Sequence, residues 1–129
     1  MIGKVLATLL TGNENLTALV PGAKIFPYII NENTPLPAII YTVENLDVTY
    51  TKEGWAVDEY DFSVSCFSED YANLQDIVLQ VRDALELSVG VYNNIRIQRI
   101  YVSGQEEGYN LGESVFMNRL SFKVGVTEY

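Results

Sequence analysis

The sequence has 129 residues, of which 48% are hydrophobic, and it carries a formal net charge of −9 at pH 7. This length fits one domain with its own core, and the hydrophobic content is too high for a disordered chain. The sequence contains no histidine, which removes the commonest general base and metal ligand, and its single cysteine excludes an intrachain disulfide. Catalytic triads of the Ser-His or Cys-His kind are therefore excluded.

The negative charge is concentrated in the middle third of the chain. Residues 1–43 and 87–129 each hold as many acids as bases, whereas residues 44–86 hold eleven acids against only Lys52 and Arg82. Phosphate contacts need clustered Lys and Arg, so we expect no specific nucleic-acid binding. A solubilising surface is the ordinary interpretation of such an acidic segment.

The first segment predicts an amphipathic helix. Its apolar residues between Ile2 and Leu10 fall on one helical stripe, and Gly12 and Asn13 can end the helix. The apolar run is too short for a signal peptide and lacks a cleavage site, and no stretch approaches the length of a membrane span. We therefore expect synthesis in the cytosol and no membrane contact.

Two strands and a turn are predicted next. Residues 24–30 predict a short strand, which Pro27 places at a sheet edge or a kink. Residues 36–50 alternate apolar and polar side chains, which predicts a long strand with a break near Asn45, and residues 51–54 predict the turn after it.

A half-buried strand then precedes the clearest helix of the sequence. In residues 59–66, the even positions are apolar or cysteine and the odd positions are polar. The helical period follows at spacings of four, three and four, through Leu74, Val78, Val81 and Leu85. Ser68 predicts the N-cap, with Glu69 and Asp70 in the first turn, and the helix should end near Leu87.

The last third predicts two strands joined by a loop. Asn93 and Asn94 suit a tight turn, because asparagine tolerates a positive φ. Residues 95–102 predict a strand, residues 103–112 a polar loop, and residues 116–126 a long alternating strand.

These elements predict the fold class. Only one helix interrupts the strands after the start, so hairpin connections should dominate. We therefore expect a single α+β domain, residues 1–129, with a mostly antiparallel sheet of about five strands and two helices packed on one face.

Each candidate chemical site has a simpler structural interpretation. Cys66 lies on the apolar side of its strand, which favours a core residue over a reactive thiol. Asp58, Glu59 and Asp61 lack the pattern of an EF-hand, which favours a solvated surface over a metal site. No glycine-rich phosphate loop is present, and Trp55 lacks basic neighbours for base stacking. We expect no catalytic residue, no metal and no cofactor.

The order of parts resembles the tail-completion or tail-terminator proteins of long-tailed bacteriophages, also called head-to-tail joining proteins. The resemblance rests on the N-terminal helix and on residues 35–41 (PLPAIIY). It continues through residues 60–67 (YDFSVSCF), the following helix, and residues 116–124 (FMNRLSFKV). Residues 93–112 match nothing in particular.

The resemblance implies a structural protein without catalytic residues. It implies a ring, typically of six subunits, that caps the head-proximal end of the tail tube, stops tube polymerisation and joins the tail to the head. The implied partners are further copies of the chain, the tail-tube protein and a head-tail connector protein. The implied location is the virion tail or neck, reached after assembly in the bacterial host cytoplasm.

A ring through which DNA passes should present acids to its bore, because like charges prevent binding. We expect part of the acidic excess to line that bore, and the candidates are Glu44, Asp47, Glu53, Asp58, Glu59 and Asp61. Simple solvation of an outer face is the alternative interpretation.

Three other functions remain open from the sequence. The protein could be a different neck or head-tail connector component, since several of these share small α+β folds. It could instead be a small acidic module of a bacterial cell that binds a protein or small ligand through its tyrosines. An enzyme is the third alternative, which the missing site chemistry disfavours.

Overall fold

The computed structural model describes residues 2–29, 35–50, 56–86, 88–92 and 94–128. It contains three α-helices, one 3-10 turn and six strands within these ranges. The helices are α1 (Ile2–Thr11), α2 (Glu14–Leu19) and α3 (Tyr71–Leu85), with the 3-10 turn at Gly22–Lys24. The strands are β1 (Ile25–Pro27), β2 (Ala38–Tyr50), β3 (Ala56–Ser68), β4 (Gly90–Tyr92), β5 (Ile95–Asn110) and β6 (Val115–Glu128). The predicted α+β fold is confirmed, with the short β4 as an additional strand.

The strands form one sheet in the order β1-β2-β3-β6-β5-β4. All neighbouring pairs are antiparallel except β1 and β2, which run parallel over three residues. β1 is an edge strand, as Pro27 predicted, because proline cannot donate to a second neighbour. A register shift between Val43 and Asn45 confirms the predicted break in β2.

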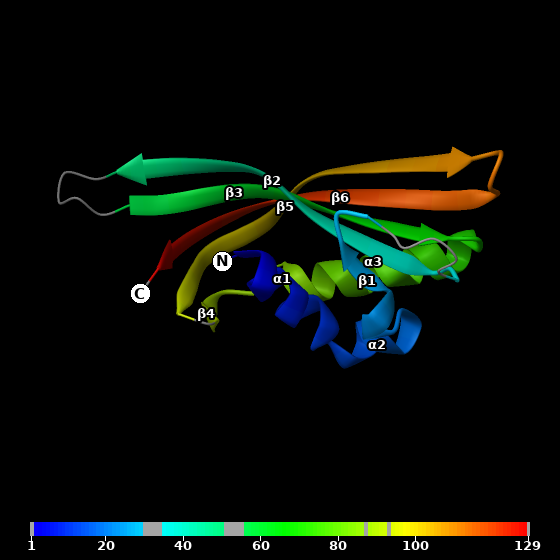
Figure 1. Ribbon diagram of the computed structural model, residues 1–129, viewed down its shortest axis with the longest axis horizontal. Coiled ribbons are helices and arrows are strands. Elements are labelled where there is room, and N and C mark those ends of the chain that lie inside the picture. The colour runs from blue at the N-terminus through cyan, green and yellow to red at the C-terminus, as the bar shows by residue number, and fades with distance from the viewer. Residues whose placement is uncertain (1, 30–34, 51–55, 87, 93, 129) are drawn as a thin grey trace.

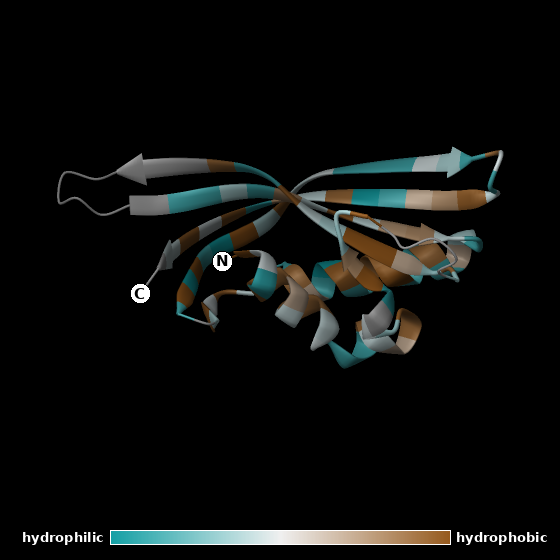
Figure 2. Cartoon of the chain, in the orientation of Figure 1, coloured by the Kyte–Doolittle hydropathy of each residue, from teal (hydrophilic) through white to brown (hydrophobic). Residues whose placement is uncertain are grey.

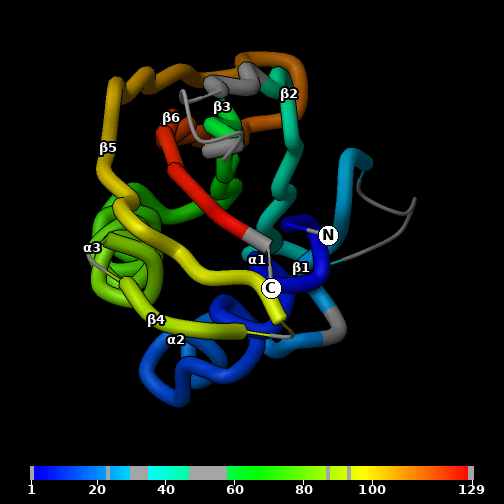
Figure 3. The backbone as a smooth tube through the Cα atoms, turned by 90° about the vertical axis from the view of Figure 1, so that its left-hand side faces the viewer, coloured from blue at the N-terminus to red at the C-terminus, as the bar shows by residue number. Residues whose placement is uncertain are grey.

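Two long hairpins extend from the middle of the sheet toward opposite ends of the molecule (Figure 1). One consists of β2 and β3 and the other of β5 and β6, and the pairing of β3 with β6 joins them. Seen along the long axis, the sheet curls, with β2 and β5 on opposite sides of the central pair (Figure 3). The helices lie together on one side of the sheet.

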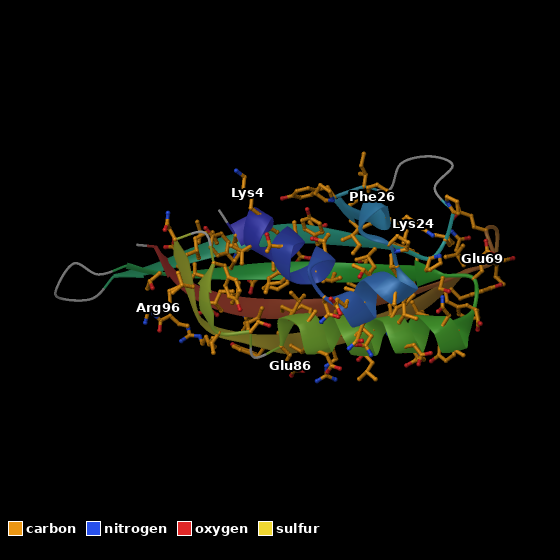
Figure 4. The ribbon with its side chains drawn as sticks, turned by 90° about the horizontal axis from the view of Figure 1, so that it is seen from below. Lys4, Lys24, Phe26, Glu69, Glu86 and Arg96 are labelled. Atoms are coloured by element: carbon orange, nitrogen blue, oxygen red, sulfur yellow. The ribbon has the colours of Figure 1, made fainter. Side chains whose placement is uncertain are left out.

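The core lies between this side of the sheet and the helices. Phe62 of β3 and Phe122 of β6 stack at its centre, with ring centroids 5.0 Å apart. From α1, Val5, Leu6 and Leu10 are fully buried against them, and α3 adds Leu74, Ile77, Val81 and Leu85. Figure 2 shows hydrophobic residues gathered where the helices face the sheet. Seen from below, α1 and α3 lie side by side across the sheet (Figure 4).

The prediction for residues 103–112 is wrong, because β5 continues through this segment to Asn110. Both sides of this stretch are polar, so no alternation marked it as a strand. Backbone pairing with β6 holds it in place, from Gly104 opposite Ser121 to Asn110 opposite Val115. The real turn is the short segment from Leu111 to Ser114.

The predicted cap of the second helix is also wrong by two positions. Asp70 is the N-cap of α3, and its Oδ1 accepts a hydrogen bond from the Ala72 amide at 3.0 Å. Ser68 instead accepts from the Asp70 amide, at 3.1 Å, in the turn that precedes the helix. α3 ends at Leu85, and Leu87, the predicted end, lies outside the described residues.

The remaining turn predictions have mixed outcomes. Asn94 has a positive φ of 66°, as predicted for a tight turn, and Asn93 lies outside the described residues. The predicted turn at residues 51–54 also lies outside them.

Candidate functional site

The face of the sheet turned away from the helices carries interleaved acids and bases. Lys123 Nζ lies 3.3 Å from Asp61 Oδ1, and Arg99 Nη2 lies 3.0 Å from Glu59 Oε2. Arg119 forms a third ion pair with Glu44. We call these six residues the charged face. Its acids come from the acidic middle of the chain and its bases from β5 and β6, so their charges balance here.

The strand register places these partners together. Asp61 lies directly opposite Lys123 in the antiparallel pairing of β3 with β6. Glu59 lies opposite Gly125, and Arg99 lies opposite Gly125 from the other side. A Cβ at position 125 would lie 3.2 Å from Cγ and Nε of Arg99. The glycine therefore gives Arg99 room to reach across β6 to Glu59.

The bulge in β2 positions the third acid. Glu44 is the extra residue between Val43, which faces Phe62, and Asn45, which faces Asp61. A hydrogen bond from Ser63 lowers the pKa of Glu44 below its ordinary value, and Arg119 adds to this effect. On the same face, the hydrogen bond and charge of Asp61 raise the pKa of Lys123. Both shifts favour the charged forms of the pairs.

The structure brings together three of the six acids predicted to line a bore, namely Glu44, Glu59 and Asp61. Asp58 is half-buried and shares the strand side of Tyr60 and Phe62, so it does not belong to the charged face. Asp47 occupies the register position opposite Glu59, but its side chain lies outside what the structure describes. Glu53 lies outside the described residues altogether. The sequence reasoning missed the three bases, because their contacts with the acids depend on β3 and β6 being neighbours.

A second polar cluster joins the start of α3 to β5 and β6. Glu107 accepts hydrogen bonds from the Tyr71 hydroxyl at 3.1 Å, from Gln75 Nε2 at 3.1 Å and from Asn118 Nδ2 at 3.2 Å. The bond to Glu107 raises the pKa of Tyr71. Asn118 is fully buried, and its Oδ1 has no hydrogen-bond partner. Sequence reasoning had placed Glu107 in a loop and missed this role.

The far end of the β5–β6 hairpin is apolar and exposed. The ring of Phe116 contacts those of Tyr109 and Tyr71, with centroids 4.6 and 5.3 Å away. Leu111 at the turn is 85% exposed. A shallow groove of about 650 Å³ lies beside it, and its apolar lining includes Phe67, Val115 and Met117. Exposed aromatic and aliphatic side chains around a groove are typical of a protein-binding surface.

The candidates for covalent or metal chemistry have structural roles. Cys66 is fully buried, as predicted, and burial raises the pKa of its thiol to about 12. Among the described residues, no group of three or more potential metal ligands lies close enough together to hold an ion. None of the helices described is both long and apolar enough to cross a membrane.

Comparison with known proteins identifies the family. Residues 4–123 match the family described as Tail completion protein gp17. The chain belongs to this family. Its members are structural tail completion proteins, so the tail completion protein described here is a structural protein and not an enzyme.

The fold of this tail completion protein also occurs in a solved structure, the virion of a native gene transfer agent particle. The two chains superpose with a TM-score of 0.73 and share 19% sequence identity. The match covers 95% of this chain and 91% of the other. At this identity the likeness shows a common fold. A search of curated proteins found no match.

Proposed function

We propose that this tail completion protein forms a ring, of six copies as the family resemblance implies, at the head-proximal end of a tail tube. There it ends polymerisation of the tube and joins the tail to the head of the virion, after assembly in the host cytoplasm. The family match over residues 4–123 carries this proposal. The fold shared with a chain of a gene transfer agent virion supports a place in a phage-like particle.

A cap of this kind needs two separate contact surfaces, one for the last ring of the tail-tube protein and one for the head-tail connector protein. The two hairpins extend toward opposite ends of the molecule, an arrangement that supports two separate contacts (Figure 1). The β5–β6 end offers the exposed Tyr109 and Leu111 beside the apolar groove. Tyrosine is among the residues that contribute most of the binding energy at protein interfaces.

The proposed ring has the charged face toward its bore. The acids Glu44, Glu59 and Asp61 each pair with a base on this face, which leaves the three bases without excess charge for DNA phosphates. We propose that Asp47 and Glu53 also line the bore, whereas Asp58 lies on the opposite side of β3 and is left out of this proposal. DNA then passes a surface of balanced or negative charge, to which it does not adhere.

A capping assay tests the proposal. Purified tail tubes are incubated with the protein and viewed by electron microscopy, with tubes alone as the control. We expect a ring at one end of each tube, and tubes carrying it should not lengthen when more tube protein is added. If the protein binds DNA-filled heads but not tubes, the proposed capping role is wrong, and the result favours a different neck component. A monomer that binds neither would favour a binding module.

A further inference from the structure

We propose that neighbouring copies in the ring join edge to edge, so that β5 of one copy pairs antiparallel with β2 of the next. This inference rests on the proposed ring and names the contact that builds it. The partner at each edge is a second copy of the same chain. The sheet then continues from copy to copy, with the helices on one side and the charged face on the other.

Both outer edges of the sheet have long stretches without a neighbouring strand. β4 covers β5 only at residues 95–97, and β1 covers β2 only at residues 39–41. In the part of the chain that the structure describes, no strand continues along residues 99–110 of β5 or residues 42–50 of β2. Unpaired backbone groups along such edges readily accept a strand from another chain.

The two free stretches share rows of the sheet from Thr42 to Asp47 of β2 and from Gly104 to Arg99 of β5. Thr42 of β2 and Gly104 of β5 belong to one row, which runs through Ser63 and Ser121. Asn45 and Tyr101 belong to another row, which runs through Asp61 and Lys123. A second copy can therefore align its β2 with this β5 by rotation alone, without sliding along the strands. A head-to-tail contact that repeats builds a ring when its rotation closes and a helical filament when it does not.

Strand direction and charge favour the same pairing. β2, β3, β6 and β5 alternate in direction, so a neighbouring β2 placed beside β5 continues the antiparallel order. In the shared rows β5 contributes Arg99 and β2 contributes Glu44 and Asp47, while Glu106 and Glu107 of β5 lie beyond these rows. Opposite charges across a strand pair are stabilising and like charges are destabilising, so a contact between two β2 edges is disfavoured.

Cross-linking between variants that each carry one added cysteine tests the contact. Tyr101→Cys and Asn45→Cys replace exposed residues of the row described above. Because the native Cys66 is buried, the unmodified protein serves as the negative control for cross-linking. The two variants are mixed, assembled on tail tubes and treated with a short bismaleimide. We expect a cross-linked dimer from the mixture, none from either variant alone, and a ladder up to the ring size from the double variant. A mixture of Tyr101→Cys with Leu79→Cys, which is exposed on α3, should give no product.

The alternative outcomes separate this inference from the proposed function. If rings are visible by electron microscopy but the mixture of Tyr101→Cys with Asn45→Cys gives no cross-link, the edge contact is wrong and the proposed ring is unaffected. Cross-linking within either single variant would indicate a two-fold contact and would also overturn it. Absence of both rings and capping would overturn the proposed function, and with it this inference. Thermal unfolding of each variant, compared with the unmodified protein, verifies that the substitutions leave the fold intact.

Discussion

At the scale of single residues, Glu107 holds the start of α3 against the sheet. Its carboxylate accepts hydrogen bonds from Tyr71 and Gln75 of α3 and from the fully buried Asn118 of β6. A buried polar group that loses its partner incurs the full cost of its desolvation. Because the other amide atom of Asn118, Oδ1, already has no partner, Glu107 provides the hydrogen bond on which this side chain depends.

We predict that Glu107→Ala lowers the free energy of unfolding by about 2 kcal/mol, chiefly because it leaves the Asn118 amide unpaired. Urea unfolding followed by circular dichroism measures the change. Glu106→Ala is the matched control, because Glu106 is the adjacent exposed acid on β5 and a surface substitution usually changes stability by less than about 0.5 kcal/mol. Equal effects of the two substitutions would contradict the role assigned to Glu107.

Residue patterns predicted which side of each strand is polar, but they did not predict which acid pairs with which base. Alternation in residues 59–66 correctly placed Glu59 and Asp61 on the polar side and Cys66 in the core. In residues 116–126, Arg119 and Lys123 occupy odd positions and therefore share one side of their strand. Which strands are neighbours is a property of the folded sheet, however, and the three ion pairs could not be assigned without it.

At the scale of elements, α3 was predicted with its period correct and its start misplaced. Serine and aspartate are both good N-caps, and residues 68–70 offer one of each around Glu69. The structure uses Asp70, while Ser68 stabilises the preceding turn through hydrogen bonds from the Asp70 amide and from Asn73. Local sequence preference could not separate these two roles.

We predict that Asp70→Ala destabilises the protein by about 1 kcal/mol, since it removes the acceptor for the Ala72 amide. Glu69→Ala serves as the control, because Glu69 is exposed and lies outside the helix. Thermal unfolding of the two variants checks the prediction. A larger loss for Glu69→Ala than for Asp70→Ala would show that the cap is wrongly assigned.

The second half of β5 shows a limit of sequence patterns. Hydrophobic alternation reports burial of one side of a strand, and residues 103–110 are buried on neither side. The segment is a strand because β6 pairs with it along its length, through the turn at residues 111–114. A strand whose two sides are both polar has no hydrophobic period by which to find it.

At the scale of the whole molecule, the charge balance of the charged face gives a prediction about DNA. The triple variant Glu44→Gln, Glu59→Gln, Asp61→Asn removes the acid partners that the structure describes for Arg99, Arg119 and Lys123. We expect this variant to bind duplex DNA at low salt, with an affinity that falls steeply as salt rises, and to slow DNA passage through assembled particles. Fluorescence anisotropy with labelled duplex measures the binding.

The control for this experiment removes the same charge elsewhere. The triple variant Glu69→Gln, Asp76→Asn, Asp83→Asn changes exposed acids on or beside α3, away from the charged face. It should bind DNA no better than the unmodified protein. Equal DNA binding by both triple variants, together with unchanged DNA passage, would contradict the proposal that the charged face lines the bore.

The pairing of β3 with β6 has a consequence for how each copy is made. It joins residues 58–68 to residues 116–126, which are separated by half of the sequence, and it places Phe62 on Phe122. Contacts of such long sequence separation form slowly, because a long chain segment must first be ordered. The sheet therefore cannot be completed until β6 has been synthesised. Because β5 joins β2 and β3 only through β6, a nascent chain without β6 lacks one of the two edges that the proposed ring contact uses, and it is not yet competent for that contact.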